Sequence, residues 1–334
     1  ADCVGTYNAA NGLFSCVDIS STITMDWKFQ RPIVASNGLI VFPPINADCI
    51  GMFDAATSAF SCVDISSTIT TNWKFQPGGV ASNGLIVFAP SNANCVGTFD
   101  AATSSFNCVD ISSTLTMIGK FRGGVVASNG LIVFMPHNAD CVGTFNAATS
   151  TFSCIDISST LSMNKKFYGE PVVASNGLIV FTPYLADCVG TFDAATSTFG
   201  CVDISSTISM DYKFKHAAIA PNGLVVFTPL HADCVGTFDA ATSTFNCVDI
   251  SSTISSDFKF QSSTVAPSGL VVFSPNRADC VGTFDAATSA FSCVDISSTI
   301  TLDGKFLDAV VAPSNGLVVF APSAANCIAT FSTV

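Results

Sequence analysis

One unit of 46 or 47 residues returns seven times along this 334-residue chain, and that period restricts the fold more than any other feature of the sequence. Two series of cysteines mark the unit, and each member of the second series lies 13 residues after a member of the first. The first series is Cys3, Cys49, Cys95, Cys141, Cys188, Cys234, Cys280 and finally Cys327. The second series is Cys16, Cys62, Cys108, Cys154, Cys201, Cys247 and Cys293. Periods of this length are typical of solenoids and propellers.

Each repeat contains four short segments rich in Val, Ile, Phe and Thr, which is the signature of strands. In one copy they are residues 120–127, 130–134, 140–145 and 152–158, and we number them first to fourth. The Asn129-Gly130 pair predicts a tight hairpin between the first two strands. No segment has the periodicity of a helix. The sequence therefore predicts an all-β fold, a seven-bladed β-propeller with four antiparallel strands per blade, closed by N- and C-terminal strands in one blade.

The cysteine series also predicts where the repeats begin and end within a single domain, 1–334. The repeats are about 1–46, 47–92, 93–138, 139–185, 186–231, 232–277 and 278–324, followed by an extra C-terminal strand in 325–334. A long β-solenoid is the alternative architecture. It needs polar terminal repeats that this chain lacks.

The repeat also resembles a known class of propeller blade. Residues 126–134 read VASNGLIVF and residues 140–145 read DCVGTF, and close variants recur in the other copies. These strings are similar to the blade repeats of NHL- and YncE-like propellers, and the resemblance covers the whole chain. The Trp-Asp pair of WD40 blades is missing. Because this class includes enzymes, scaffolds and binding proteins, the resemblance implies the fold and no particular function.

The spacing of the cysteines predicts a disulfide between the third and fourth strands of every blade, from Cys3–Cys16 to Cys280–Cys293. If the paired positions of the first repeat add up to 19, Cys3 faces Cys16 and Gly5 faces Phe14. Cysteines opposite each other on antiparallel strands are close enough to form a disulfide. Free buried thiols are the alternative. Disulfides persist outside the reducing cytosol, so we expect a secreted protein that is extracellular or on the cell surface.

The charge and hydropathy of the chain exclude two classes of partner. The net charge of −12 repels phosphate backbones and anionic lipid, so we expect no nucleic-acid partner. No apolar run approaches the ~20 residues that cross a bilayer, so we expect no membrane insertion.

The regularity of the repeats also bears on catalysis. A catalytic site combines unlike residues, so it should appear as a departure from the repeat. The three histidines, His137, His216 and His231, occupy three different offsets, and Glu170 is the only glutamate. No cluster has metal-ligand spacing. We therefore expect no catalytic residues, no metal, no cofactor and no enzymatic activity.

Two charged residues recur once per repeat. The lysines are Lys28, Lys74, Lys120, Lys166, Lys213, Lys259 and Lys305. Ten residues before each lysine stands an aspartate: Asp18, Asp64, Asp110, Asp156, Asp203, Asp249 and Asp295. We expect seven Lys–Asp pairs, because a buried charge needs a partner. The alternative is an axial ring of lysines that binds an anion such as a carboxylate or a sulfated glycan.

Aromatic and arginine side chains gather in the loops that vary between repeats, before the first strand and after the second. They predict a binding face, because aromatics and Arg dominate interface hot spots. Loop variation without function is the alternative. The residues of this face are Trp27, Arg31, Trp73, Arg122, Tyr168, Tyr184, Tyr212 and Arg277.

The third strand occurs eight times and every other strand seven, so one copy is surplus. We expect residues 1–7 to complete the last blade and residues 325–334 to be left over with Cys327, unpaired or in an intermolecular bond. A free apolar strand favours addition to a neighbouring chain. The alternative is that this tail displaces residues 1–7, that Cys327 pairs with Cys16, and that Cys3 is freed. The sequence thus favours a non-catalytic structural subunit of an extracellular assembly, such as a filament, that self-associates through its C-terminal strand or variable face. A glycan-binding or other ligand-binding, lectin-like module is the alternative function.

Overall fold

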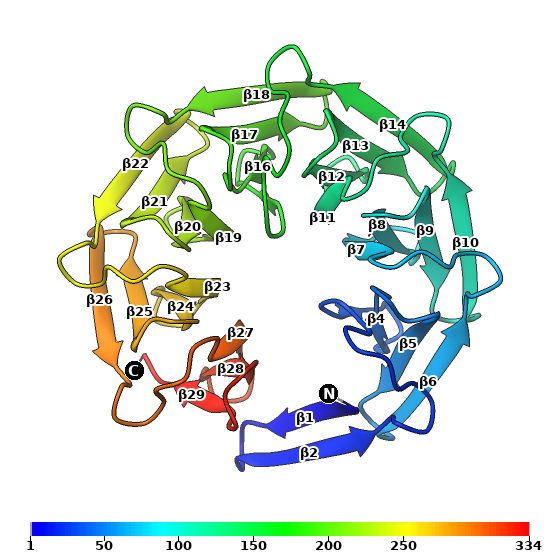
Figure 1. The fold of residues 1–334 in the computed structure, drawn as a ribbon, viewed down its shortest axis with the longest axis horizontal. Coiled ribbons are helices and arrows are strands. Elements are labelled where there is room, and N and C mark those ends of the chain that lie inside the picture. Colours follow the sequence, from blue (N-terminus) through cyan, green and yellow to red (C-terminus); the bar gives the residue numbers. More distant parts are fainter. Residues whose placement is uncertain (1, 334) are drawn as a thin grey trace. The chain divides into compact units, whose positions relative to one another are not determined.

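The computed structural model of the protein describes residues 2–333, and every regular element in that range is a β-strand (Figure 1). Within that range no helix is long and apolar enough to span a membrane. The chain divides into two compact units, which are described separately. Among the described residues, the first comprises 2–8, 12–164 and 194–197, and the second comprises 9–11, 165–193 and 198–333.

The first unit holds a two-stranded hairpin and three four-stranded antiparallel sheets. The hairpin is β1 (Cys3–Asn8) and β2 (Leu13–Asp18). The sheets, in hydrogen-bonding order, are β3 (Ile33–Val34), β4 (Ile40–Phe42), β5 (Cys49–Asp54) and β6 (Ala59–Asp64); β7 (Phe75–Val80), β8 (Ile86–Pro90), β9 (Cys95–Asp100) and β10 (Ser105–Asp110); and β11 (Phe121–Val126), β12 (Ile132–Pro136), β13 (Cys141–Asn146) and β14 (Thr151–Asp156).

The second unit holds three four-stranded sheets and one three-stranded sheet, all antiparallel. They are β15 (Val172–Val173), β16 (Ile179–Phe181), β17 (Cys188–Asp193) and β18 (Thr198–Asp203); β19 (Phe214–Ile219), β20 (Val225–Pro229), β21 (Cys234–Asp239) and β22 (Thr244–Asp249); β23 (Phe260–Val265), β24 (Val271–Pro275), β25 (Cys280–Asp285) and β26 (Ala290–Asp295); and β27 (Phe306–Val311), β28 (Val318–Pro322) and β29 (Ala329–Phe331).

The predicted fold class is confirmed. The seven sheets that begin with β3, β7, β11, β15, β19, β23 and β27 are the seven blades of an all-β propeller. Second strands such as β12 are buried along their whole length, as their continuous apolar sequence predicts. Fourth strands such as β14 alternate between exposed and half-buried residues. The core therefore lies between the faces of successive sheets, where clusters such as Val87, Val96, Phe121 and Phe134 pack.

All seven predicted disulfides are present, from Cys3–Cys16 to Cys280–Cys293, with Cα–Cα distances of 5.3 to 5.5 Å. They indicate an oxidising compartment. The predicted register is wrong by two residues, because Gly5 opposes Cys16 and Cys3 opposes Asp18. The cause is a turn of four residues, Ala9 to Gly12, between the two strands. Its last residue has a left-handed backbone, with φ of +72° at Gly12.

The pairing of the last blade also differs from the prediction. β29, in the C-terminal tail, pairs with β28 as the third strand, while β1 pairs with β2 and leaves the last blade with three strands. The tail therefore takes the place that residues 1–7 were expected to fill. The alternative prediction was right that the C-terminal tail displaces residues 1–7 from β28. It was wrong about the disulfide, because Cys3 stays bonded to Cys16 and Cys327 is a free, exposed thiol.

Candidate functional site

The residue before each recurring lysine has a left-handed backbone in all seven repeats, with φ between +51° and +69°. These residues are Trp27, Trp73, Gly119, Lys165, Tyr212, Phe258 and Gly304. The carbonyl of each accepts a hydrogen bond from a backbone N–H of the loop after the second strand, such as Arg277 N to Phe258 O at 3.0 Å. The local fold therefore requires this backbone conformation in every blade.

Bulky side chains at this position are unfavourable for the fold itself. A left-handed backbone costs a residue with a Cβ roughly 1–2 kcal/mol, whereas glycine adopts it freely. Gly119 and Gly304 show that glycine satisfies the position in two repeats. Trp, Tyr and Phe at four of the remaining positions are strained outliers of the kind that cluster at functional sites.

In the second unit these positions form part of a continuous row of rings, which we call the aromatic row: Tyr168, Tyr184, Tyr212, His231 and Phe258. Centroids of successive rings are 4.7, 5.0, 5.4 and 4.4 Å apart. The first four rings are half-buried and Phe258 is exposed. The row thus presents one aromatic surface assembled from the blades that begin with β15, β19 and β23.

Cations and carboxylates flank the aromatic row. Lys215 Nζ lies 4.5 Å from the centroid of the Tyr168 ring, and the Arg277 guanidinium carbon lies 4.7 Å from that of Phe258. Lys165 Nζ lies 5.9 Å from the Tyr212 ring. Arg277 also pairs with Asp303 at 3.6 Å. The positive charges are therefore engaged with rings or carboxylates, and the surface carries both signs.

His231 lies in the middle of the row, with Nδ1 3.8 Å from Asp257 Oδ1. Burial lowers its pKa from the ordinary value of 6.5, and the nearby Asp257 carboxylate partly opposes that shift. Its Nε2 is buried and has no hydrogen-bond partner among the described residues. The ring is consequently neutral at pH 7 and serves as an aromatic surface.

A smaller cluster of the same kind lies in the first unit. The rings of Trp27 and Trp73 are 6.4 Å apart, and the Arg122 guanidinium lies 5.8 Å from the Trp73 centroid. A hollow of about 190 Å³ next to them is lined by Trp73, Arg122 and His137 among others.

The structure places the residues that the sequence assigned to the variable face in two clusters. Tyr168, Tyr184 and Tyr212 make successive tilted and edge-to-face ring contacts, and Arg277 lies on the same row. Trp27, Trp73 and Arg122 form the smaller cluster in the first unit. Arg31 is half-buried beside β3. His231, Phe258, Lys165 and Lys215 also belong to the surface of the aromatic row, and they were not predicted from the sequence. The position of Phe258 in its repeat could have identified it, because it directly precedes a recurring lysine as Trp27 does.

The recurring lysines are buried, with side-chain exposure of 0 to 7%. Their predicted partners are wrong. Lys74, Lys213, Lys259 and Lys305 pair with the aspartate 26 residues earlier, such as Asp187 at 2.7 Å from Lys213. The aspartates ten residues before the lysines, which were predicted as partners, instead accept hydrogen bonds from backbone N–H groups. In one of them, the bond from Ser66 N lowers the pKa of Asp64. In these four repeats the lysine charge is therefore neutralised by an aspartate of the preceding repeat.

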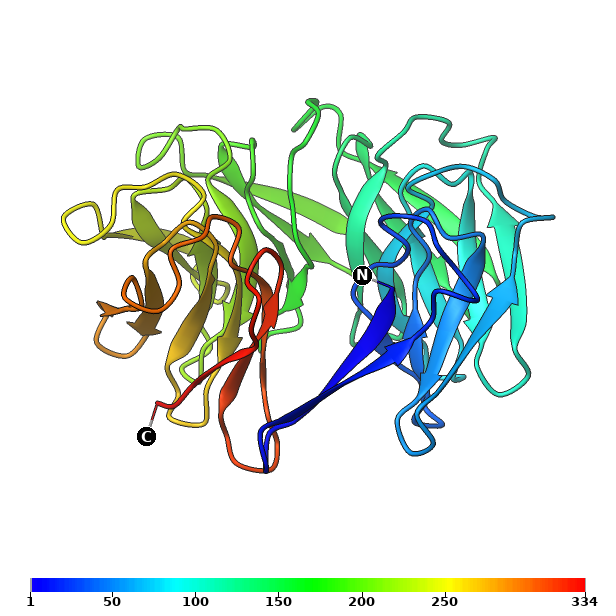
Figure 2. The ribbon, with the colours of Figure 1, turned by 60° about the horizontal axis from the view of Figure 1, so that its bottom comes forward.

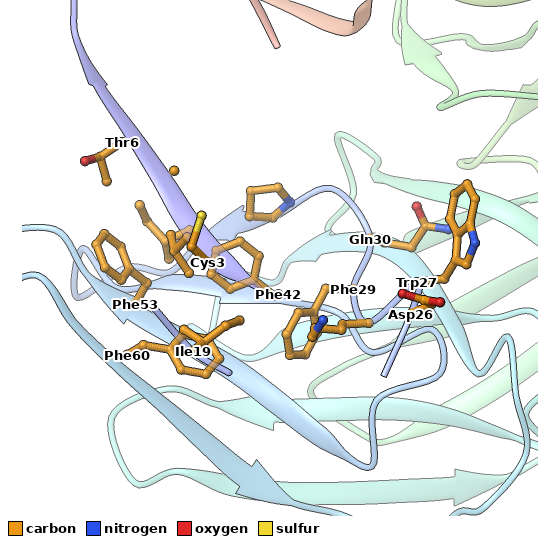
Figure 3. Close-up of a pocket in the computed structure, with 15 residues that line it drawn as sticks. Cys3, Thr6, Ile19, Asp26, Trp27, Phe29, Gln30, Phe42, Phe53 and Phe60 are labelled. Atoms are coloured by element: carbon orange, nitrogen blue, oxygen red, sulfur yellow. The ribbon is translucent and has the colours of Figure 1, made fainter. Parts of the chain in front are cut away.

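A cavity of about 590 Å³ lies in the first unit between β1 and the sheet β3–β6 (Figure 3). Residues 3–6 of β1 form one wall, and Phe29, Phe42, Phe53 and Phe60 form much of the other. Within residues 2–333, no three His, Cys, Asp or Glu side chains are grouped as a metal site. The cavity is therefore a groove with β1 on one side and an aromatic wall on the other, and Asp26, Lys28 and Gln30 also line it.

No protein-family model and no curated protein sequence matches the chain. Solved structures do resemble it. A catalytically inactive virginiamycin B lyase from Staphylococcus aureus with quinupristin has a TM-score of 0.65 at 13% identity, over 90% of this chain and 94% of that one. A streptogramin B lyase has a TM-score of 0.65 at 16% identity, over 90% and 92%. The WD40 repeats of RRP9 have a TM-score of 0.61 at 10% identity, over 90% and 89%.

These similarities establish the propeller fold, and they correct one expectation. The regular repeats predicted no enzymatic activity, but the solved structures that resemble this chain include lyases. That prediction is wrong, because regular repeats in the core do not prevent the loops of a propeller from carrying catalytic groups.

Proposed function

We propose that the protein is a secreted glycan-binding propeller and that the aromatic row is its binding surface. The observation that carries the proposal is the placement of Tyr212 and Phe258 at left-handed positions that the fold fills with glycine elsewhere. Residues with a strained backbone cluster at functional sites, where their side chains contact a ligand. The disulfides support an extracellular location.

The charges of the row favour a neutral glycan over an anionic one. Arg277 already pairs with Asp303, and His231 is uncharged at pH 7. The net charge of −12 repels sulfated polymers at long range. Aromatic rings supply flat apolar surface for sugar rings, while carboxylates such as Asp257 accept hydrogen bonds from hydroxyl groups.

The test is a titration of neutral soluble oligosaccharides and of heparin against the full chain and two variants, Tyr212→Gly and Phe258→Gly. Each variant removes one ring and relieves backbone strain, so the unfolding midpoint should hold while affinity falls about tenfold. Ser150→Gly is the matched control, because Ser150 has a left-handed backbone (φ +52°) in a turn outside the row. Unchanged affinity in both ring variants, or saturable binding of heparin alone, contradicts the proposal.

A second candidate function is self-association into an extracellular assembly. The specific observation is the surplus strand: β29 occupies the edge of β28, and β1 pairs with β2 alone. Concentration-dependent oligomers without added ligand would support it.

A further inference from the structure

The hollow of about 190 Å³ in the first unit is lined by residues of two neighbouring sheets, β7–β10 and β11–β14, and of their loops. The two sheets lie side by side, and their first strands, β7 and β11, are in contact (Figure 1 and Figure 2). Trp73 and Asn92 come from loops of the first sheet, and Gly119, Arg122 and His137 come from the second sheet and its loops. The hollow therefore lies where two blades of the same unit meet.

Gly119 keeps the hollow open. It occupies the left-handed position that carries Tyr212 in another repeat, with φ of +64°. A Cβ on Gly119 would lie 2.7 Å from Nδ2 of Asn138 and 3.9 Å from Cδ2 of His137, and all three residues line the hollow. The hollow therefore includes the space that a side chain at this position would enter.

The repeat that contains Tyr212 shows what occupies this place elsewhere in the chain. There the Tyr212 ring lies 5.0 Å from the ring of Tyr184 and 5.4 Å from that of His231, measured between centroids. His231 is the counterpart of Asn138, because each stands two residues after the proline that ends the second strand. The backbone of the repeat therefore accommodates a ring in this place, and glycine at position 119 leaves it open.

The hollow has room for one ring. A cavity of ~150 Å³ accommodates a benzene molecule. At about 190 Å³, the hollow therefore holds a six-membered ring with a small substituent, and not two rings. The Trp73 side chain, which is 39% exposed, offers a flat apolar wall on which such a ring stacks.

The charge in the hollow favours an acidic ring. The guanidinium carbon of Arg122 lies 5.8 Å from the centroid of the Trp73 ring, so a positive charge is held beside the apolar wall. None of the described residues that line the hollow is Asp or Glu. Arg122 is half-buried, so water screens its charge less than on an open surface. A guanidinium binds a carboxylate through two parallel hydrogen bonds.

Asn92 adds a fixed polar group. Its Nδ2 donates a hydrogen bond to the Asn72 carbonyl, and its Oδ1 accepts one from Gly119 N, both at 2.9 Å. An amide has two N–H groups and an oxygen with two lone pairs, so these bonds leave one donor and one lone pair for a hydroxyl group. The amide is therefore held in place before any ligand arrives.

We propose that this hollow is a second ligand site, which binds a single six-membered ring that carries a carboxylate, such as a uronic acid at the end of a glycan. The ring stacks on Trp73 in the space that Gly119 leaves, and the carboxylate binds Arg122. The site shares no residue with the aromatic row, so it does not rest on the function proposed above. The net charge of −12 does not prevent binding, because charges beyond about 8 Å are largely screened at physiological ionic strength.

The test is an NMR titration of the full chain with glucuronate, benzoate and glucose. Glucuronate should bind at least about tenfold more tightly than glucose, because only glucuronate has a carboxylate for Arg122. Benzoate separates the two sources of an acidic ring. Binding of glucuronate alone assigns a sugar acid, and equal binding of benzoate shows that the ring and the carboxylate suffice. If neither acid binds saturably, or if glucose binds as tightly as glucuronate, the proposal is overturned.

Two variants test the residues of the site. Trp73→Gly and Arg122→Met should each weaken glucuronate binding about tenfold. Trp27→Gly is the control for the ring, because Trp27 has the same left-handed backbone (φ +51° against +56° for Trp73) and does not line the hollow. Arg31→Met is the control for the charge, since it removes an arginine of the same unit from outside the hollow.

Full affinity for glucuronate in Trp73→Gly or in Arg122→Met would overturn the site, and so would an equal loss in a variant and its control. Tyr212→Gly, which removes a ring of the aromatic row, should leave glucuronate binding unchanged. A failure of the neutral-glycan proposal and a failure of this one therefore give different results.

Discussion

Lys120 donates a hydrogen bond from Nζ to Asn94 Oδ1 at 3.2 Å, where Lys74 and Lys213 meet an aspartate in the equivalent place. Lys120 therefore carries a buried charge without that carboxylate, and burial lowers its pKa from 10.5 to about 8. Between these two pH values the unfolded chain binds more protons than the folded one, so this site makes stability rise with pH.

Asn94→Asp should restore the ion pair and raise the pKa of Lys120. We expect the free energy of unfolding at pH 7 to increase by about 1 kcal/mol and the rise in stability above pH 8 to flatten. Denaturant unfolding at pH 7 and pH 10 measures both effects. Asn107→Asp, which adds the same charge on an exposed strand position, is the control and should do neither.

Gly190→Ala should destabilise its blade, because a Cβ there would lie 2.5 Å from Cζ of the buried Phe167. Overpacking of this kind costs about 1–3 kcal/mol. Gly5→Ala is the matched control, since its Cβ meets only the outer edge of the exposed Phe14 ring. Thermal unfolding of both variants checks the difference, and equal midpoints would refute the role assigned to the third-strand glycine.

His231 should titrate below 6.5, and Asp257→Asn should lower its pKa further by removing the nearby negative charge. Because the folded pKa lies below the unfolded one, the unfolded chain binds the proton more tightly. This site therefore destabilises the fold as the pH falls through 6.5. NMR titration of the ring measures the pKa, and a value above 6.5 would show that the ring is not held neutral.

The double variant Cys95→Ser/Cys108→Ser should lower the free energy of unfolding by up to about 3 kcal/mol, since the disulfide closes a short loop within one hairpin. Cys327→Ser, at the exposed free thiol, should leave it unchanged. Equilibrium unfolding under non-reducing conditions compares the two.

The sequence predicted the features that depend on near neighbours. Asn129-Gly130 forms the expected turn, with φ of +83° at Gly130, because only a few local residues determine it. The register of the first repeat was wrong because its turn has four residues, Ala9 to Gly12, and the sequence alone does not fix the length of that turn.

Features that depend on competition between distant segments were not predictable in the same way. Lys74 had two candidate carboxylates, Asp48 and Asp64, and only the folded chain shows that Asp48 is the partner. Similarly, residues 1–7 and the C-terminal tail are near copies of one strand, so their competition for β28 is decided by tertiary structure. The aromatic row was only partly found because its members come from three blades.

The left-handed position before each buried lysine carries Trp, Trp, Gly, Lys, Tyr, Phe and Gly on one and the same backbone conformation. Since the same backbone hydrogen bond holds each of these carbonyls, the identity of the side chain is independent of the core beneath it. Duplication of a repeat therefore copies this backbone conformation and its hydrogen bond, and a single substitution changes the side chain that the repeat exposes before its lysine. The side chain presented above the lysine can therefore differ from blade to blade while the backbone stays the same, much as hypervariable loops differ on a constant scaffold.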